Sequence, residues 1–458
     1  MLNWICSANL RRSLNFIAIA FAGLMSLVPH NAHALPSYAR QTGLPCQTCH
    51  TIAFGPALTP YGQTFKLNAY AWGSAENSFP PIAAMQVSSF TNTQKGQDGG
   101  AAPHFASNDN VAADQTSLFY GGRIAGPVGA FVQVTYDGVA QRLAWDNLDI
   151  RFAKSLKVAG KPVVYGLSLN NNPTVQDLWN STPAWSFPYE SSPLAPTPAA
   201  APAIEGAFAT QVGGLTAYTM IDDLLYLEGG AYRELPHRLQ SQLGVGPSGE
   251  TTIKGFSPYW RAALQHQLGS VYASVGTFGM AAHVRPGGDD SMGEDHLTDF
   301  GFDSTAQWQL NKANALNANL TFVHENQKLP ASFALGASAN TFNTLNSMRF
   351  NAAYVWRQTI SASIGSFDIH GSNDSGLYAP GAISGSASGS PNSRGLIYQL
   401  EYVPFGKFNS YLKPWVNVRL GLQYTAYSRF NGDGDNYDGN GRNAGDNNTL
   451  YFFVWLAG

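Results

Sequence analysis

The sequence predicts a mostly β protein, a transmembrane antiparallel β-barrel of about 16 strands with a small N-terminal helical c-type haem domain. Two observations predict the barrel. Segments of about ten residues with alternating apolar and polar side chains recur from Ile82 onward. Glycine, asparagine, aspartate or proline separates these segments. The haem domain is predicted by a third observation, a C-x-x-C-H motif that precedes the segments.

The composition is consistent with such a barrel. Charged residues make up 12% of the 458 residues, against roughly 25% in average soluble proteins. The formal net charge of −3 provides no basic surface for a polyanion, so nucleic acid is not an expected partner. The mean hydropathy is −0.15, and after the N-terminal segment no apolar run reaches the ~18 residues of a helical span. We therefore expect strands, rather than helices, to meet the membrane lipid.

Residues 1–34 are expected to form a Sec-type signal peptide. Arg11 and Arg12 provide the basic region, and residues 13–28 are mostly apolar. The sequence A-H-A at 32–34 has the small residues of a cleavage site, so cleavage is expected after Ala34. An uncleaved anchor is the alternative, although the apolar stretch is shorter than a typical span. Export to the bacterial outer membrane is the expected outcome.

Residues 35–80 are expected to form a haem domain around the sequence LPCQTCHT at 44–51. Cys6 leaves with the signal peptide, so Cys46 and Cys49 are the only cysteines of the mature chain. A structural zinc site would need four ligands, and no second cysteine pair is present. A redox dithiol would be expected beside a βαβ pattern, which the neighbouring sequence lacks. Covalent haem c needs no further cysteine: Cys46 and Cys49 would form the thioethers and His50 would be the proximal iron ligand.

The residues after the motif predict a short helix. Thr59 is suited to the N-cap and Pro60 to the first helical position. Phe65, Leu67 and Tyr70 are expected to pack against the haem. The helical unit should end near residue 73.

The distal side of the haem needs a further ligand. Met85 is the first methionine after the motif and is the candidate distal ligand to the iron. A second histidine is the alternative and would usually give a lower reduction potential. A unit of about 40 residues is marginal on its own, so the haem and the rest of the chain are expected to complete its core.

Residues 81–458 are predicted to form the barrel. Tilted strands of about 9–11 residues span a bilayer, and only a closed barrel leaves no unpaired edge in lipid. A soluble secreted β-protein is the alternative, but one alternating face is rich in glycine, serine, threonine, asparagine and glutamine. Aromatic residues expected at the membrane interfaces are Tyr136, Tyr165, Trp260, Trp356, Trp415 and Trp455. Candidate strands lie near 115–125, 128–138, 162–171, 204–211, 223–232, 256–267, 270–282, 300–310, 316–325, 346–357, 359–369, 395–404, 413–427 and 450–458.

Two connecting segments have unusual compositions. Six prolines between Pro183 and Pro202 exclude a regular strand or helix there. We expect either an external loop or a loop folded into the lumen, the interior of the barrel. A second segment could attract a divalent cation through oxygen ligands, with a solvated loop as the alternative. Its candidate ligands are Asp289, Asp290, Glu294, Asp295, His296, Asp299 and Asp303.

Both ends of the chain resemble one family. The segment YARQTGLPCQTCHT…LTPYGQTFKLNAY resembles the N-terminus of the outer-membrane monohaem cytochrome–porin fusions, which include iron(II)-oxidising outer-membrane cytochromes. The ending FNGDGDNYDGNGRNAGDNNTLYFFVWLAG is similar to the C-termini of porin-fused cytochromes. The resemblance implies that Cys46, Cys49 and His50 hold one haem c.

The function that this resemblance implies is electron transfer across the outer membrane. Electrons would pass through the haem between an extracellular donor or acceptor and a periplasmic electron carrier. Fe(II) is the first donor to test, which would make the protein an Fe(II) oxidase. Two alternatives remain open. One is a porin-like channel for small solutes with the haem domain as a plug or sensor, and the other is a secreted thiol–disulfide protein with a β-rich body.

Overall fold

The computed structural model describes residues 37–73, 80–245, 251–288, 291–410 and 415–458. The predicted signal peptide and its cleavage site lie outside the described residues, as do Asp289 and Asp290 of the acidic segment. The first described helices precede residue 73, and the first strand begins at Ile82.

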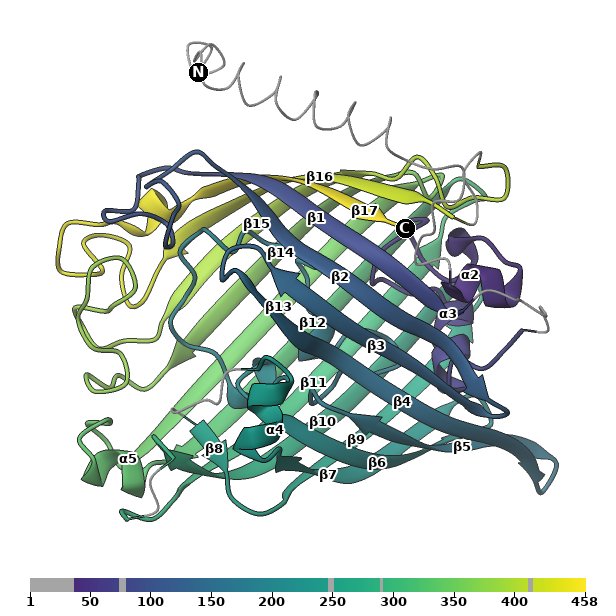
Figure 1. Cartoon of the computed structure of the whole chain (residues 1–458), viewed down its shortest axis with the longest axis horizontal. Coiled ribbons are helices and arrows are strands. Elements are labelled where there is room, and N and C mark those ends of the chain that lie inside the picture. Colours follow the sequence, from purple (N-terminus) through teal and green to yellow (C-terminus); the bar gives the residue numbers. More distant parts are fainter. Residues whose placement is uncertain (1–36, 74–79, 246–250, 289–290, 411–414) are drawn as a thin grey trace, which may run out of the picture.

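The described residues contain seventeen strands in one antiparallel sheet, and sixteen of them form a closed ring (Figure 1). The ring closes because β1 pairs with β17 on one side and with β2 on the other. The short strand β8 pairs only with the end of β10. The prediction of a barrel of about 16 strands is thus confirmed. The strands are β1 (Ile82–Thr93), β2 (Asn110–Ala125), β3 (Val128–Asp137), β4 (Arg142–Val158), β5 (Lys161–Asn170), β6 (Val212–Ile221), β7 (Leu225–Glu234), β8 (Thr251–Ile253), β9 (Ser257–Leu268), β10 (Val271–Pro286), β11 (Asp295–Gln309), β12 (Asn314–Lys328), β13 (Phe342–Trp356), β14 (Ile360–Gly371), β15 (Ser393–Tyr402), β16 (Asn417–Arg429) and β17 (Thr449–Ala457).

The two ends of the barrel differ in their connections. At one end most hairpins close with turns of two to four residues, such as 126–127 and 269–270. Most connections at the other end are longer and carry α4 (His237–Gln242), α5 (Pro330–Ala334) and a 3₁₀ turn (Ala444–Asn447). The N-terminal helices α2 (Ser37–Thr42) and α3 (Pro60–Leu67) lie at the short-turn end (Figure 1). No helix in the described residues is both long and apolar enough to cross a membrane.

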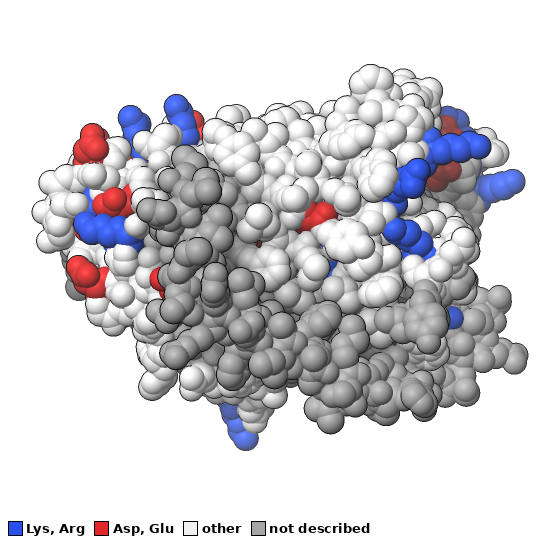
Figure 2. Space-filling view, turned by 90° about the horizontal axis from the view of Figure 1, so that it is seen from above, with Lys and Arg blue, Asp and Glu red and all other residues white. Residues whose placement is uncertain are grey.

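The outer surface of the barrel carries a broad apolar belt. Charged side chains gather toward the two ends of the face in Figure 2, and few lie between them. Strand β5 shows the origin of the belt, because Leu167 and Leu169 are exposed while Ser168 and Asn170 are buried in the interior. A closed barrel with this exterior has the surface of a protein that spans a lipid bilayer. Exposed apolar strand residues include Leu118, Leu215, Leu264, Phe302, Phe350, Leu400 and Leu422.

The aromatic side chains divide between the two faces. The predicted interface residues Tyr136, Tyr165, Trp260 and Trp356 are exposed. The prediction for Trp455 was wrong: with Tyr451 and Phe453 it points inward. Its ring packs edge-on against Phe54, 5.2 Å away between centroids. Trp415 is half-buried, with the Arg40 guanidinium 5.0 Å from its ring.

The proline-rich segment folds into the lumen. Residues 171–211 connect β5 to β6 and cross the interior, with 3₁₀ turns at Pro183–Trp185 and Ala203–Glu205. On one wall the carbonyl of Ser181 accepts a hydrogen bond from Thr321 on β12 at 2.6 Å. On the other wall the hydroxyl oxygens of Ser192 and Thr91 on β1 lie 2.6 Å apart. The strand predicted at 204–211 is therefore wrong, because those residues end this luminal loop and β6 begins only at Val212.

Candidate functional site

The C-x-x-C-H motif forms one tight turn. Cys46–Thr48 is a 3₁₀ turn, and the amides of Cys49 and His50 both donate to the Cys46 carbonyl at 3.0 Å. Both cysteines are free thiols and are half-buried. The spacing therefore brings both sulfur-bearing residues onto one turn, with the imidazole-bearing residue directly after it.

Helix α3 packs closely on this turn. Thr59 caps the helix as predicted: its hydroxyl accepts from the Gly62 amide at 3.3 Å and donates to the Thr48 carbonyl at 2.7 Å. A Cβ atom on Gly62 would lie 2.3 Å from the Cys49 carbonyl oxygen. The absence of a side chain at this position is what allows the helix to approach the motif.

The barrel holds the motif turn through backbone contacts. Gln358, in the β13–β14 turn, donates its side-chain amide to the carbonyls of Gln47 at 2.9 Å and His50 at 3.0 Å. The Gln47 amide donates to the Gly406 carbonyl at 3.0 Å in the β15–β16 connection. On the far side of the motif, Gln307 donates to Leu58 at 2.7 Å. The helical unit is thus fixed against the short-turn end of the barrel.

A second set of contacts joins α3 to the luminal loop. The Lys66 ammonium nitrogen donates to the Val175 carbonyl at 2.8 Å and to the Asn180 side-chain oxygen at 2.9 Å. Burial lowers the pKa of Lys66 to about 7. The Tyr70 hydroxyl donates to the Asp149 carboxylate on β4 at 2.6 Å. Hydrogen bonds therefore join the helical unit both to the luminal loop and to the barrel wall.

A cavity of about 390 Å³ lies where these three parts meet. Cys46, Cys49 and His50 line it from the helical unit, and Met85 lines it from β1. The four residues predicted to hold a haem are thus brought to one cavity, although Met85 belongs to the first strand and not to the helical unit. Aromatic residues form much of the remaining lining: Tyr38, Phe54, Phe65, Tyr70, Phe119, Phe131, Trp185, Tyr189 and Trp455.

The ionisation of the motif residues follows from their burial. Burial lowers the pKa of His50 to about 4, so its imidazole is neutral at pH 7. The His50 Nδ1 atom is buried and has no hydrogen-bond partner among the described residues. Burial also raises the pKa of both cysteine thiols, that of Cys49 to about 12. Thiols held protonated in this way are poor nucleophiles for disulfide exchange.

The residues present fit a haem c group. A neutral imidazole can ligate iron, two thiols on one turn can form the two thioethers, and an aromatic cavity suits a macrocycle. Two of the three apolar residues predicted to pack on the haem, Phe65 and Tyr70, line the cavity. Leu67 does not, because it packs into a separate cluster that includes Leu178 and Trp179.

The luminal loop adds residues to the site that no sequence pattern indicated. Trp185 and Glu190 line the cavity from this loop. Glu190 accepts a hydrogen bond from the Gln115 side-chain amide at 2.9 Å, and burial raises its pKa to about 8. Only the folding of the loop into the lumen brings these side chains to the motif, so local sequence carries no signal for them.

Within the described residues the acidic segment does not form the predicted oxygen site; Asp289 and Asp290 lie outside them. Asp295, Asp299 and Asp303 belong to β11 and are buried inside the barrel. Asp295 accepts from the Ala331 amide at 2.9 Å at the start of α5. Asp303 pairs with Arg261 at 2.8 Å. Glu294 and His296 form a separate group with His283, a residue that the prediction did not include.

Comparisons with known proteins give only distant similarities. No protein-family model and no curated protein matches the chain. Among solved structures, the chain is similar to OmpF of Salmonella typhi in complex with daunomycin (TM-score 0.45, 13% identity, covering 82% of this chain and 97% of that one). It is also similar to an anion-selective porin from Comamonas acidovorans (0.42, 12%, covering 82% and 98%). A third is a loop-deletion mutant of OmpT, an outer-membrane protein of Vibrio cholerae (0.41, 7%, covering 82% and 97%).

Proposed function

We propose that this barrel is an outer-membrane c-type cytochrome. One haem c is bound through Cys46 and Cys49, with His50 as the proximal ligand. The haem carries electrons between an extracellular donor or acceptor and a periplasmic carrier. The observation that supports this proposal best is the shared cavity, which is lined by the two cysteines and the histidine of the helical unit and by Met85 of β1.

The position of the cavity suits this role. In outer-membrane barrels the short turns face the periplasm and the long loops face outward. The helical unit lies at the short-turn end, so a periplasmic carrier would reach the haem from that side. The luminal loop lies between the cavity and the long-loop end, and Trp185 and Tyr189 are its aromatic contributions to the cavity wall.

Each part of the cavity has a separate chemical task. The haem supplies a one-electron iron couple, whose potential depends on the axial ligands, hydrogen bonds and burial. His50 would ligate the iron: burial favours its neutral form, and its Nδ1 atom has no hydrogen-bond partner among the described residues. Met85 on the distal side would raise the potential relative to a second histidine. Lys66 also lines the cavity, and an anionic substituent of the haem beside it would favour its protonated form against the effect of burial.

The test is covalent haem in the full protein, produced with haem-maturation machinery and judged by its visible spectrum and by haem staining on a denaturing gel. Cys46→Ala/Cys49→Ala should abolish staining. Met85→Ala should keep the staining but change the spectrum and lower the potential. Met292→Ala is the matched control, because this methionine is 51% exposed and does not line the cavity. Wild-type protein without covalent haem would overturn the proposal.

Fe(II) is the first extracellular donor to examine. Protein in liposomes should reduce an enclosed acceptor when Fe(II) is added outside, and the Cys46→Ala/Cys49→Ala variant should not. Electron transfer from another external reductant but not from Fe(II) would exclude Fe(II) as the donor and would leave the proposed electron transfer in place.

A porin-like channel is the second candidate function. The closed sixteen-strand barrel among the described residues, with its long loop folded inside, favours this candidate. Solute flux that is unchanged in Cys46→Ala/Cys49→Ala, together with no redox communication in wild type, would support the channel over the cytochrome.

A further inference from the structure

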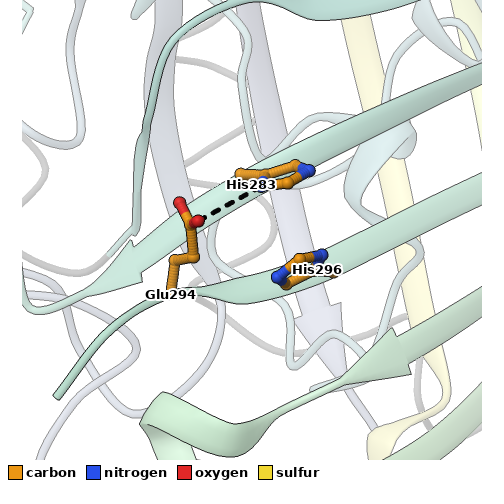
Figure 3. Close-up of side chains that lie close together, drawn as sticks. All are labelled: His283, Glu294 and His296. Carbon is orange, nitrogen blue, oxygen red and sulfur yellow. Dashed lines mark ion pairs between the residues drawn. The ribbon is translucent and has the colours of Figure 1, made fainter.

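We infer that His283, Glu294 and His296 bind a divalent transition-metal ion on the outer face of the barrel, at its long-loop end. His283 lies on β10 and His296 on β11, and the hairpin register pairs these two residues directly (Figure 3). Glu294 immediately precedes β11. The site goes beyond the proposed haem function and uses none of its residues.

The three side chains are already close enough to share one ion. One ligand atom from each lies within 4.8 Å of the others. The two imidazole rings are 4.1 Å apart between centroids, and the His283 Nδ1 atom is 3.5 Å from a Glu294 carboxylate oxygen. Ligands at 2.0–2.2 Å from a metal lie about 3–3.5 Å from one another. Small side-chain rotations would therefore complete the site.

The ligand set selects the class of metal. Two imidazoles and one carboxylate suit Zn²⁺, Fe²⁺, Ni²⁺ or Cu²⁺, whereas Mg²⁺ and Ca²⁺ prefer oxygen ligands alone. Three protein ligands leave further positions for water or for a molecule at the surface. The other charged group that pairs with Glu294 is Lys254, 3.8 Å away. It approaches Oε2, whereas His283 approaches Oε1, so one oxygen still faces the imidazoles.

The site is separate from the haem cavity. His283 is exposed between the buried residues Ala282 and Val284, so it points away from the lumen. Tyr272 lies near the start of the same strand, at the short-turn end, where its hydroxyl is 2.5 Å from the Gln63 side-chain oxygen. Eleven residues of strand at about 3.3 Å each place His283 about 36 Å further along. A metal bound here is thus on the expected outer side of the membrane, beyond direct contact with the haem.

Metal binding to the tag-free full chain in detergent micelles tests the inference. Zn²⁺ titration by calorimetry should give one site per chain, and Co²⁺ should give a visible spectrum with imidazole ligation. His283→Ala and His296→Ala should each weaken Zn²⁺ binding by at least about tenfold. His324→Ala is the matched control, because this histidine also lies on the outer face, on β12, but bonds Asn346 at 2.8 Å.

Two further variants separate this site from the neighbouring lysine and from the haem motif. Lys254→Ala should tighten Zn²⁺ binding, because it frees the second oxygen of Glu294. Cys46→Ala/Cys49→Ala should leave Zn²⁺ binding unchanged, so a failure of the haem proposal would not affect this one. Unchanged Zn²⁺ affinity in folded His283→Ala/His296→Ala protein, with barrel folding checked by circular dichroism, would overturn the inference.

Discussion

Replacing Arg261 on β9 should release the luminal loop from the barrel wall. The Arg261 side chain is fully buried between two carboxylates. Its guanidinium makes two contacts with Asp303 on the wall, at 2.8 and 2.9 Å, and one with Asp177 on the loop, at 3.0 Å. Arg261→Gln leaves both carboxylates in the interior without their cation.

The expected cost follows from this burial. Removing one partner of a buried ion pair destabilises a protein by about 3–5 kcal/mol. The second oxygen of Asp177 accepts from the amides of Ser181 at 2.8 Å and Thr182 at 3.1 Å, which keep the turn of the loop in shape. The lost stability should therefore be that of the contact between the luminal loop and the barrel wall. Asp177→Asn in the same chain should recover part of it, with a coupling of about 2–3 kcal/mol.

A double-mutant cycle measures this coupling from denaturant unfolding, in detergent micelles, of the wild type, the two single variants and the double variant. Conductance in planar bilayers provides a second readout, which should rise in Arg261→Gln as the loop leaves the lumen. The exposed pair Lys161 and Asp222 is the matched comparison. Their side chains are 62% and 38% exposed, and their atoms are 2.5 Å apart. Exposed pairs couple by less than about 1 kcal/mol. A coupling for Arg261 and Asp177 no larger than that of the exposed pair, with unchanged conductance, would refute the reasoning.

Three further outcomes are expected. Gly62→Ala should destabilise the helical unit by about 1–3 kcal/mol and reduce haem attachment, because the new Cβ meets the Cys49 carbonyl; Gly229→Ala on β7, with open space around it, should do neither. Burial raises the pKa of Glu190 from 4.5 to about 8, so between these pH values the folded state keeps a proton that the unfolded state loses. The free energy of unfolding should therefore fall, by up to about 1.4 kcal/mol per pH unit, as the pH rises through this range. Glu190→Gln should remove this slope in unfolding curves taken from pH 5 to 8. Asp374→Asn should speed protease cleavage of the long loops at pH 7. Burial alone would raise the pKa of Asp374, but amide donors such as the backbone N–H of residue 339 hold this pKa below its usual value. The stabilising contribution of the Asp374 carboxylate is therefore present above about pH 4 and lost as the pH falls further.

The alternation of the strands was readable from sequence because lipid and lumen select opposite side chains. In β5, Tyr165 and Leu167 face outward and Ser168 faces inward, as the pattern indicated. The same logic failed at 204–211. Ile204 and Phe208 are buried there because a loop packs against the inside of the barrel, and periodicity alone does not separate this from a strand.

Apart from Met85, the candidate site was predictable only where it is local. The motif turn and the N-cap at Thr59 depend on neighbouring residues, so their patterns are visible in the sequence. Glu190 and Trp455 reach the cavity through the luminal loop and the last strand, which no local pattern relates to the motif. The pairing of His283 with His296 depends on the hairpin register, which the sequence left open.

The cavity also lies at the seam where the two ends of the chain meet. Met85 is on the first strand and Trp455 on the last, and both strands belong to the contact that closes the ring. If the proposed haem is bound, the motif turn would hold it through two thioethers before closure, but this part of the wall would be missing. Ligation by Met85 would then coincide with the final step of barrel assembly. The visible spectrum of the haem would then change when β1 pairs with β17, so it would report barrel closure during assembly.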